Sequence, residues 1–148
     1  MPLLSTLFLA VCSISATASA LAQEKPFETT VVATFDEPWA MTFLADGRLL
    51  VTEKKGVLKL MAADGTSADI RGVPKVAYGG QGGLGDVVLH PDFANNRRLY
   101  VSYAEAGEGA LRGGVVARAT LTLSEGDAGG ALSDLEVIWR QVPKVEGA

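Results

Sequence analysis

Short stretches of alternating apolar and polar residues, separated by tight turns, run along most of this 148-residue chain. The alternation has a period of two, which is typical of strands with one buried face. Asp46-Gly47 and Asp64-Gly65 are typical hairpin turns. No stretch after residue 23 keeps a helical period. The pattern predicts strands at Ala40–Leu44, Arg48–Glu53, Val57–Met61 and near Ile70–Val73, then at Gly83–His90, Arg98–Tyr103, Gly114–Leu123 and Leu135–Arg140.

The two sets of four strands resemble each other. The pattern of Met41–Val51 begins again at Val87 and continues, after a longer loop, through Arg98–Val101. Repeats of roughly 40–50 residues with four strands each indicate a β-propeller. The sequence therefore predicts an all-β fold, a β-propeller built from four-stranded antiparallel blades. A β-sandwich is the alternative, and the repeat favours the propeller.

The number of blades is smaller than a closed propeller needs. Propellers have about 4–8 blades, and this chain holds about two. Two blades alone would leave open strand edges and half-covered apolar faces. We therefore expect residues 23–148 to be an incomplete propeller domain, a fragment of a longer protein. Copies of the chain could also complete one another as a homo-oligomer, in which case the purified chain would form multimers.

The first 22 residues differ from the rest of the chain. Residues 1–22 contain no charged side chain, and the apolar run Leu3–Ile14 is followed by small residues. This pattern predicts a secretory signal peptide that is cleaved after Ala20 or Ala22. The apolar run is shorter than the ~20 residues that a membrane span needs. The mature residues 23–148 would then be periplasmic or secreted, with no membrane span, and the only cysteine would be removed with the signal.

Composition excludes several classes of function. The formal net charge is −4, from 13 Lys and Arg against 17 Asp and Glu, and no basic cluster offers a nucleic-acid site. One Cys and one His cannot build a Cys/His zinc site. The single His90 could serve as a base, but its place at a strand end before Pro91 indicates a turn residue. Trp39 and Trp139 fall within predicted strands and are expected to pack in the core or between blades.

The segment Tyr78–Asp86 is the most unusual part of the sequence. Five glycines surround the single amide side chain of Gln81. Glycine lets a backbone approach a ligand closely, and a glutamine amide offers both donors and an acceptor. In a propeller, a loop before the first strand of a blade lies near one mouth of the central channel. Gln81 is therefore a candidate binding residue, although a turn without a ligand fits the same composition.

Several segments, in the same order, resemble the soluble pyrroloquinoline-quinone-dependent sugar dehydrogenases. This is the glucose/sorbosone dehydrogenase family, and its aldose sugar dehydrogenases are the most similar. The matching segments are Pro38–Glu53, Gly80–Leu84, Leu89–Phe93, Tyr100–Tyr103 and Val137–Gln141. The resemblance implies a six-bladed propeller that holds pyrroloquinoline quinone (PQQ) and calcium. It also implies oxidation of an aldose sugar to a lactone, with a His base and an electron acceptor, and a cofactor- and substrate-binding role for Gln81.

One departure from the family limits what this chain is expected to do. The family's catalytic His follows a segment like Pro143–Val145 within a few residues, and no His stands between Val145 and Ala148. His90 matches the family's His-Pro-Asp-Phe turn and not its base. We therefore expect no catalytic residue and no metal ligand in this chain. The resemblance makes residues 23–148 the N-terminal part of the family's propeller domain. PQQ and calcium would bind to the full-length parent and not to this fragment, which would be inactive. The alternative function is a non-catalytic propeller that binds protein or glycan.

Overall fold

The computed structural model describes residues 27–126 and 129–146. The chain divides into two units, Met1–Thr30 and Val31–Ala148. The predicted signal peptide, residues 1–22, lies outside the described residues. The second unit carries all the strands of those ranges.

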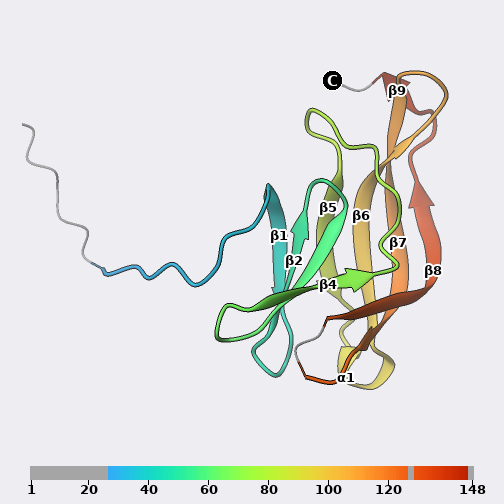
Figure 1. The fold of residues 1–148 in the computed structure, drawn as a ribbon. Coiled ribbons are helices and arrows are strands. Elements are labelled where there is room, and N and C mark those ends of the chain that lie inside the picture. The colour runs from blue at the N-terminus through green and yellow to red at the C-terminus, as the bar shows by residue number, and fades with distance from the viewer. Residues whose placement is uncertain (1–26, 127–128, 147–148) are drawn as a thin grey trace, which may run out of the picture. The chain divides into compact units, whose positions relative to one another are not determined.

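Two four-stranded antiparallel meanders build the second unit (Figure 1). The first contains β1 (Pro38–Phe43), β2 (Leu49–Glu53), β3 (Val57–Met61) and β4 (Ser67–Arg71). The second contains β5 (Leu84–Leu89), β6 (Arg98–Ala106), β7 (Leu111–Leu123) and β8 (Gly130–Arg140). The short strand β9 (Val145–Glu146) pairs with β7. The prediction of an all-β fold with two four-stranded antiparallel units is confirmed.

Several strand bounds differ from the prediction: the strand expected near Ile70–Val73 lies at Ser67–Arg71, β6 and β7 are longer than predicted, and β9 was not predicted. Two further differences have a clear physical cause. The loop expected after His90 contains a one-turn helix, α1 (Phe93–Asn96), which is too short to leave a helical period in the sequence. Strand β8 begins at Gly130, well before the predicted start at Leu135. Its first residues, which have little strand propensity, pair with the end of β7 and also with β4. Tertiary pairing therefore extends the strand beyond what local propensity indicates.

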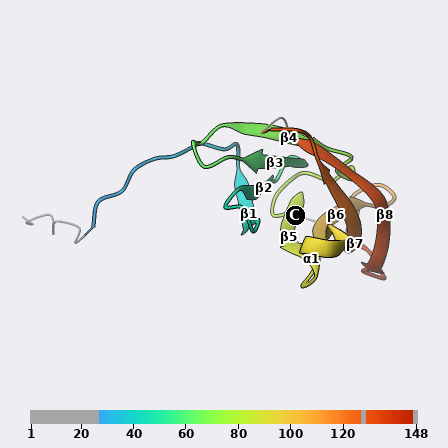
Figure 2. The ribbon, with the colours of Figure 1, turned by 90° about the horizontal axis from the view of Figure 1, so that it is seen from below.

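The two meanders are joined through their last strands. Ile70 and Arg71 of β4 pair in parallel with Gly130 and Ala131 of β8. A side chain at position 130 would overlap the carbonyl oxygen of Thr122, so glycine is required there. At the other side, β5 packs against β1 and β2. Figure 2 shows the resulting curved arrangement, with β1–β4 and β5–β8 facing each other.

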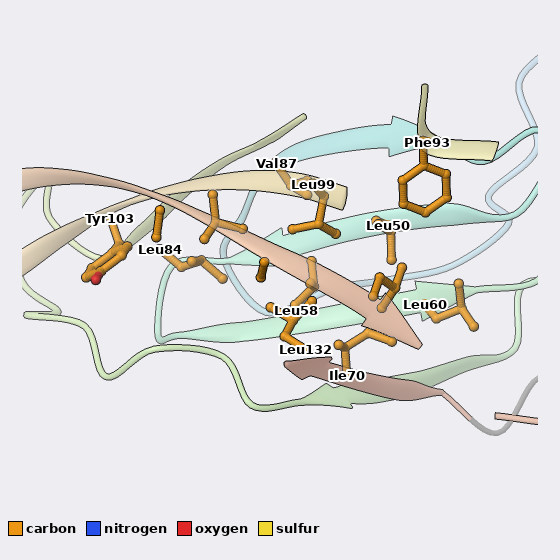
Figure 3. Close-up of a cluster of buried hydrophobic side chains, with 14 of the residues drawn as sticks. Leu50, Leu58, Leu60, Ile70, Leu84, Val87, Phe93, Leu99, Tyr103 and Leu132 are labelled. Carbon is orange, nitrogen blue, oxygen red and sulfur yellow. The ribbon is translucent and has the colours of Figure 1, made fainter. Parts of the chain in front are cut away.

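The hydrophobic core lies between the two meanders (Figure 3). Alternate residues of β6, namely Leu99, Val101 and Tyr103, are buried, as are alternate residues of β7 from Val115 to Leu121. Leu50, Leu58, Leu60 and Ile70 face them from the first meander. The period of two seen in the sequence therefore marks the packed face of each meander.

The opposite face of β1 is apolar and exposed. Trp39, Met41 and Phe43 stand at alternate positions of this strand, and each is more than half exposed. Trp139 of β8 is also 55% exposed. The expectation of half-covered apolar faces is therefore confirmed. Trp39 and Trp139 were expected to pack in the core or between blades; their exposure contradicts the first alternative, and packing between blades stays a prediction. Strand pattern alone does not distinguish the two faces of a sheet when both are apolar.

Candidate functional site

Gln81 lies at the tip of a tight turn. Gly79 and Gly82 form an isolated β-bridge, with the Gly82 amide donating to the Gly79 carbonyl oxygen at 2.7 Å. Gly80 has a φ of 51°, while Gln81 has an ordinary negative φ, which is the arrangement of a type II′ turn. The Gln81 side chain is exposed, and its amide has no hydrogen-bond partner in the described part of the chain. Its donors and acceptor are therefore free to meet a ligand.

Backbone hydrogen bonds hold the segments on both sides of the turn. On one side, the amide of Ala77 donates to the carbonyl oxygen of Ala104, and the amide of Ala104 donates to that of Gly83. On the other side, the amide of Leu84 donates to the carbonyl oxygen of Lys54 at 2.9 Å. These bonds tie the turn to β6 and to the β2–β3 turn. The position of Gln81 is consequently set by two different elements.

The side chain of Lys54 strengthens this attachment. Its ammonium nitrogen donates to the carbonyl oxygen of Gly80 at 2.8 Å. The same nitrogen lies 6.0 Å from the ring centre of Trp39 and 5.9 Å from that of Tyr78, within the range of cation–π attraction. The Tyr78 hydroxyl in turn donates to a Glu37 carboxylate oxygen, which raises the pKa of Tyr78. Two aromatic rings and one carbonyl therefore hold Lys54 against the residue before Gln81.

Gln81 borders a cavity of about 300 Å³, which we name the tryptophan cavity. Trp39, Trp139, Tyr103 and the glycines of the turn also line it. Tyr103 is only 7% exposed, and no hydrogen bond of its hydroxyl is present among the described residues. Every fully shielded side-chain polar atom in that part of the chain has a partner. The Tyr103 hydroxyl is therefore still open to solvent. Burial is the main cause that raises its pKa.

A second cavity lies on the other side of Gln81, with a volume of about 280 Å³. It is lined by Gln81, Arg112, Gln141 and Val145, together with glycines of β7 and of the turn. We name it the arginine cavity. Gln141 is fixed there because its side-chain oxygen accepts a hydrogen bond from the Gly114 amide at 2.9 Å. Gln81 thus stands between an aromatic cavity and a cationic one.

A charge cluster anchors the chain after β8. Glu105 accepts hydrogen bonds from Arg140 at 2.9 Å and from Lys144 at 2.7 Å. These two cations lower the pKa of Glu105 to about 2. Lys144 also donates to the carbonyl oxygen of Ala106. The cluster holds the segment between β8 and β9 against β6, beside the arginine cavity.

The side chain of His90 makes its hydrogen bonds within its own loop. Its Nδ1 accepts a hydrogen bond from the Asp92 amide at 3.0 Å and lies 2.9 Å from the Asn96 side-chain nitrogen. Its ring stacks on Tyr100 with ring centres 6.1 Å apart. It lines neither the tryptophan cavity nor the arginine cavity. These contacts support the interpretation of His90 as a turn residue.

Two further features of the described part of the chain bear on metals and membranes. Residues 27–126 and 129–146 contain no group of three or more His, Cys, Asp or Glu side chains placed to hold a metal ion. No helix within those ranges is long and apolar enough to cross a membrane.

Among the residues around these cavities, only Gln81 was predicted from the sequence as a site residue. Lys54, Tyr103 and Arg112, which the fold brings next to the glycine-rich turn, were missed. Lys54 belongs to a turn between two predicted strands, and Tyr103 and Arg112 belong to strands or their ends. Nothing local in the sequence links them to Gln81, because each approaches it only through tertiary packing.

Comparison with known proteins identifies the family. Residues 35–148 match the family model for glucose/sorbosone dehydrogenase. The chain is 42% identical over 112 residues to the aldose sugar dehydrogenase YliI of Escherichia coli K12, and the match covers 74% of this chain and 29% of that protein. The chain thus spans about three tenths of the length of this relative.

Solved structures agree with this assignment. The apo form of the soluble aldose sugar dehydrogenase of Escherichia coli is 40% identical, with a TM-score of 0.66 over 74% of this chain and 31% of that one. The PQQ-bound aldose sugar dehydrogenase of Streptomyces coelicolor is 25% identical, with a TM-score of 0.64 over 78% of this chain and 33% of that one. The two meanders are therefore blades of a β-propeller, and the chain belongs to the glucose/sorbosone dehydrogenase family.

Proposed function

We propose that this chain is the N-terminal part of a quinone-dependent oxidoreductase that oxidises aldose sugars to lactones. The observation that carries the proposal is the position of Gln81, whose unpaired amide is held on a fastened turn between two cavities. Both the name of the Escherichia coli relative and the PQQ-bound structure of the Streptomyces relative support this chemistry.

The residues around Gln81 fit a planar quinone that carries carboxylates. Trp39 and Trp139 offer aromatic surface to a flat ring, and the neighbouring glycines leave backbone uncovered by side chains. The Gln81 amide offers hydrogen bonds to carbonyl oxygens. Arg112 offers a guanidinium to a carboxylate. This donor set fits the carbonyl and carboxylate groups of PQQ.

Each of these residues would bind and orient rather than react. Oxidation of an aldose to its lactone removes two electrons and two protons, and a bound quinone supplies the acceptor for the electrons. Gln81 would fix the sugar or the quinone through its amide, and the fastened turn would keep that amide in place. Preorganised donors of this kind cost no rearrangement when the reaction occurs.

Several expectations from the sequence stay predictions. They are the signal peptide in residues 1–22, a periplasmic or secreted location, calcium in the parent protein and self-association of the chain. The preferred sugar and the electron acceptor also stay open. The intact mass of the protein purified from its source would test whether residues 23–148 belong to a longer polypeptide.

Substitution of Gln81 tests the proposal. In the complete protein, Gln81→Ala should lower quinone-dependent sugar oxidation about tenfold or more, the effect of losing one or two hydrogen bonds to a ligand. Thermal stability should be unchanged, because the side chain is exposed and unpaired. Gln81→Glu is the matched control, since it keeps the length of the side chain but removes its donors. Unchanged kinetics of Gln81→Ala at saturating quinone would contradict the proposed role.

A further inference from the structure

The two faces of the β6–β7 hairpin differ in their charges. Glu105 pairs with Gly113 and Ala106 pairs with Arg112 across the hairpin. Neighbouring residues of a strand point to opposite faces of a sheet, so Glu105 and Arg112 lie on opposite faces. The face of Glu105 also carries Lys144, whose side chain would contact a Cβ placed at Gly113. The face of Arg112 carries Ala104 and Gly114 and forms one wall of the arginine cavity.

Glu105 is therefore not available to Arg112. Glu105 is already neutralised by Arg140 and Lys144 on its own face. Within residues 27–126 and 129–146, no carboxylate forms an ion pair with Arg112, and no hydrogen bond of its guanidinium is found. Arg71 and Arg98 also lack acid partners in those ranges, but both are exposed to solvent. Arg112 is partly buried in a cavity, where an uncompensated charge costs more.

The surroundings of the guanidinium leave room for a ligand. A Cβ placed on Gly79 would lie 3.0 Å from a guanidinium nitrogen of Arg112, so the glycine lets the turn approach that group closely. Gln81 lines the same cavity with its free amide. Gln141 contributes a second amide, whose oxygen is used by Gly114 and whose nitrogen can still donate. The cavity therefore combines a permanent cation with two amide donors.

We propose that Arg112 and Gln81 form a subsite for the carboxylate of a small ligand. A guanidinium group stays charged at neutral pH and binds a carboxylate through two parallel hydrogen bonds. The carboxylate would belong either to an acidic sugar, such as a hexuronate, or to the quinone acid. This proposal rests on the proposed function, because it places the subsite beside the residues that would bind the sugar and the quinone.

Calorimetric titration of the full chain tests the subsite directly, without a need for turnover. D-Glucuronate should bind at least about tenfold more tightly than D-glucose, which has the same ring without the carboxylate. Arg112→Gln should remove this difference and leave the weak binding of D-glucose unchanged. Arg71→Gln is the matched control, because it removes one exposed arginine charge away from the cavity and should preserve the difference. Circular dichroism of each variant checks that the fold is retained.

The source of the carboxylate is decided by a second titration, with PQQ. If PQQ binds, loses affinity in Arg112→Gln and excludes D-glucuronate, the subsite takes the carboxylate of the quinone. If PQQ and D-glucuronate bind together and only D-glucuronate depends on Arg112, the subsite takes the sugar acid. If neither PQQ nor D-glucuronate depends on Arg112 for its affinity, the proposal is overturned.

The same experiments separate this proposal from the proposed function. Loss of sugar oxidation in Gln81→Ala, with carboxylate binding unaffected by Arg112→Gln, would preserve the function and reject the subsite. Carboxylate binding that depends on Arg112, with normal oxidation in Gln81→Ala, would preserve the subsite and reject the role given to Gln81.

Discussion

The ammonium nitrogen of Lys54 lies 2.8 Å from the carbonyl oxygen of Gly80, and this contact links the β2–β3 turn to the turn that carries Gln81. Lys54 lies between β2 and β3 of the first meander, and Gly80 lies in the segment that leads into β5 of the second meander. The contact therefore couples one blade to the segment at the start of the next blade. The backbone repeats the link, because the carbonyl oxygen of Lys54 accepts from the Leu84 amide. The candidate site is therefore built on a junction between blades.

Replacement of Lys54 should loosen the Gln81 turn without unfolding the protein. Lys54→Met removes the hydrogen bond to Gly80 and both cation–π contacts, at a cost of about 1–2 kcal/mol. Amide hydrogen exchange at Gly82 should become faster, while exchange in the centre of β6 and β7 should change little. Lys54→Arg keeps the charge and should restore most of the protection. Equal protection of Gly82 in Lys54→Met and in the native chain would show that the side chain does not hold the turn.

Gly83 should not tolerate a side chain. A Cβ at this position would overlap the Lys54 carbonyl oxygen, and φ is 147°, a conformation that L-residues avoid. Gly83→Ala should therefore lower the free energy of unfolding by about 2–4 kcal/mol, measured by urea denaturation. Gly109→Ala is the control, since φ is 58° but the space around that Cα is open, and it should cost only about 1 kcal/mol. Equal losses in the two variants would contradict the close approach at Gly83.

The Glu105 cluster predicts a loss of stability in acid. The pKa of Glu105 is about 2 in the folded chain, against an ordinary value of 4.5. The ionised carboxylate therefore stabilises the fold fully above pH 4.5, and this contribution falls as the pH drops toward 2. Glu105→Gln should lower the free energy of unfolding at pH 7 by about 1–2 kcal/mol. The difference between the native chain and Glu105→Gln should shrink between pH 4.5 and pH 2. A difference that stays constant over this range would rule out the proposed ion pairing.

Ligand binding in the tryptophan cavity should be visible by fluorescence. The chain has two tryptophans, and both are more than half exposed and line this cavity. Iodide should quench both in the free chain, and any PQQ that binds in this cavity should reduce that access. In each of the variants Trp39→Phe and Trp139→Phe, the fluorescence of the one remaining tryptophan should be protected from iodide when PQQ is bound. If PQQ binds by calorimetry but does not alter iodide access in either variant, it occupies another place.

Much of the local structure could be predicted from the sequence. The strand Val57–Met61 was predicted with the bounds that the structure shows, because its alternation and flanking glycine turns are purely local signals. The helix α1 and the early start of β8 could not be predicted in this way. One turn of helix leaves no periodic pattern, and the first residues of β8 become a strand only because β4 and β7 lie beside them.

For the candidate site, the sequence by itself singled out Gln81 as a candidate binding residue, its glycine neighbours and the turn setting of His90, since each depends on short-range chemistry. The binding role of Gln81 stays a prediction. Only the tertiary structure decided which side chains surround Gln81. Lys54 reaches it from another turn, and Arg112 and Tyr103 reach it from opposite faces of the β6–β7 hairpin. The exposure of Trp39 and Trp139 was likewise decided by which sheet face found a partner, because hydrophobic burial depends on what packs against a side chain and not on the side chain alone.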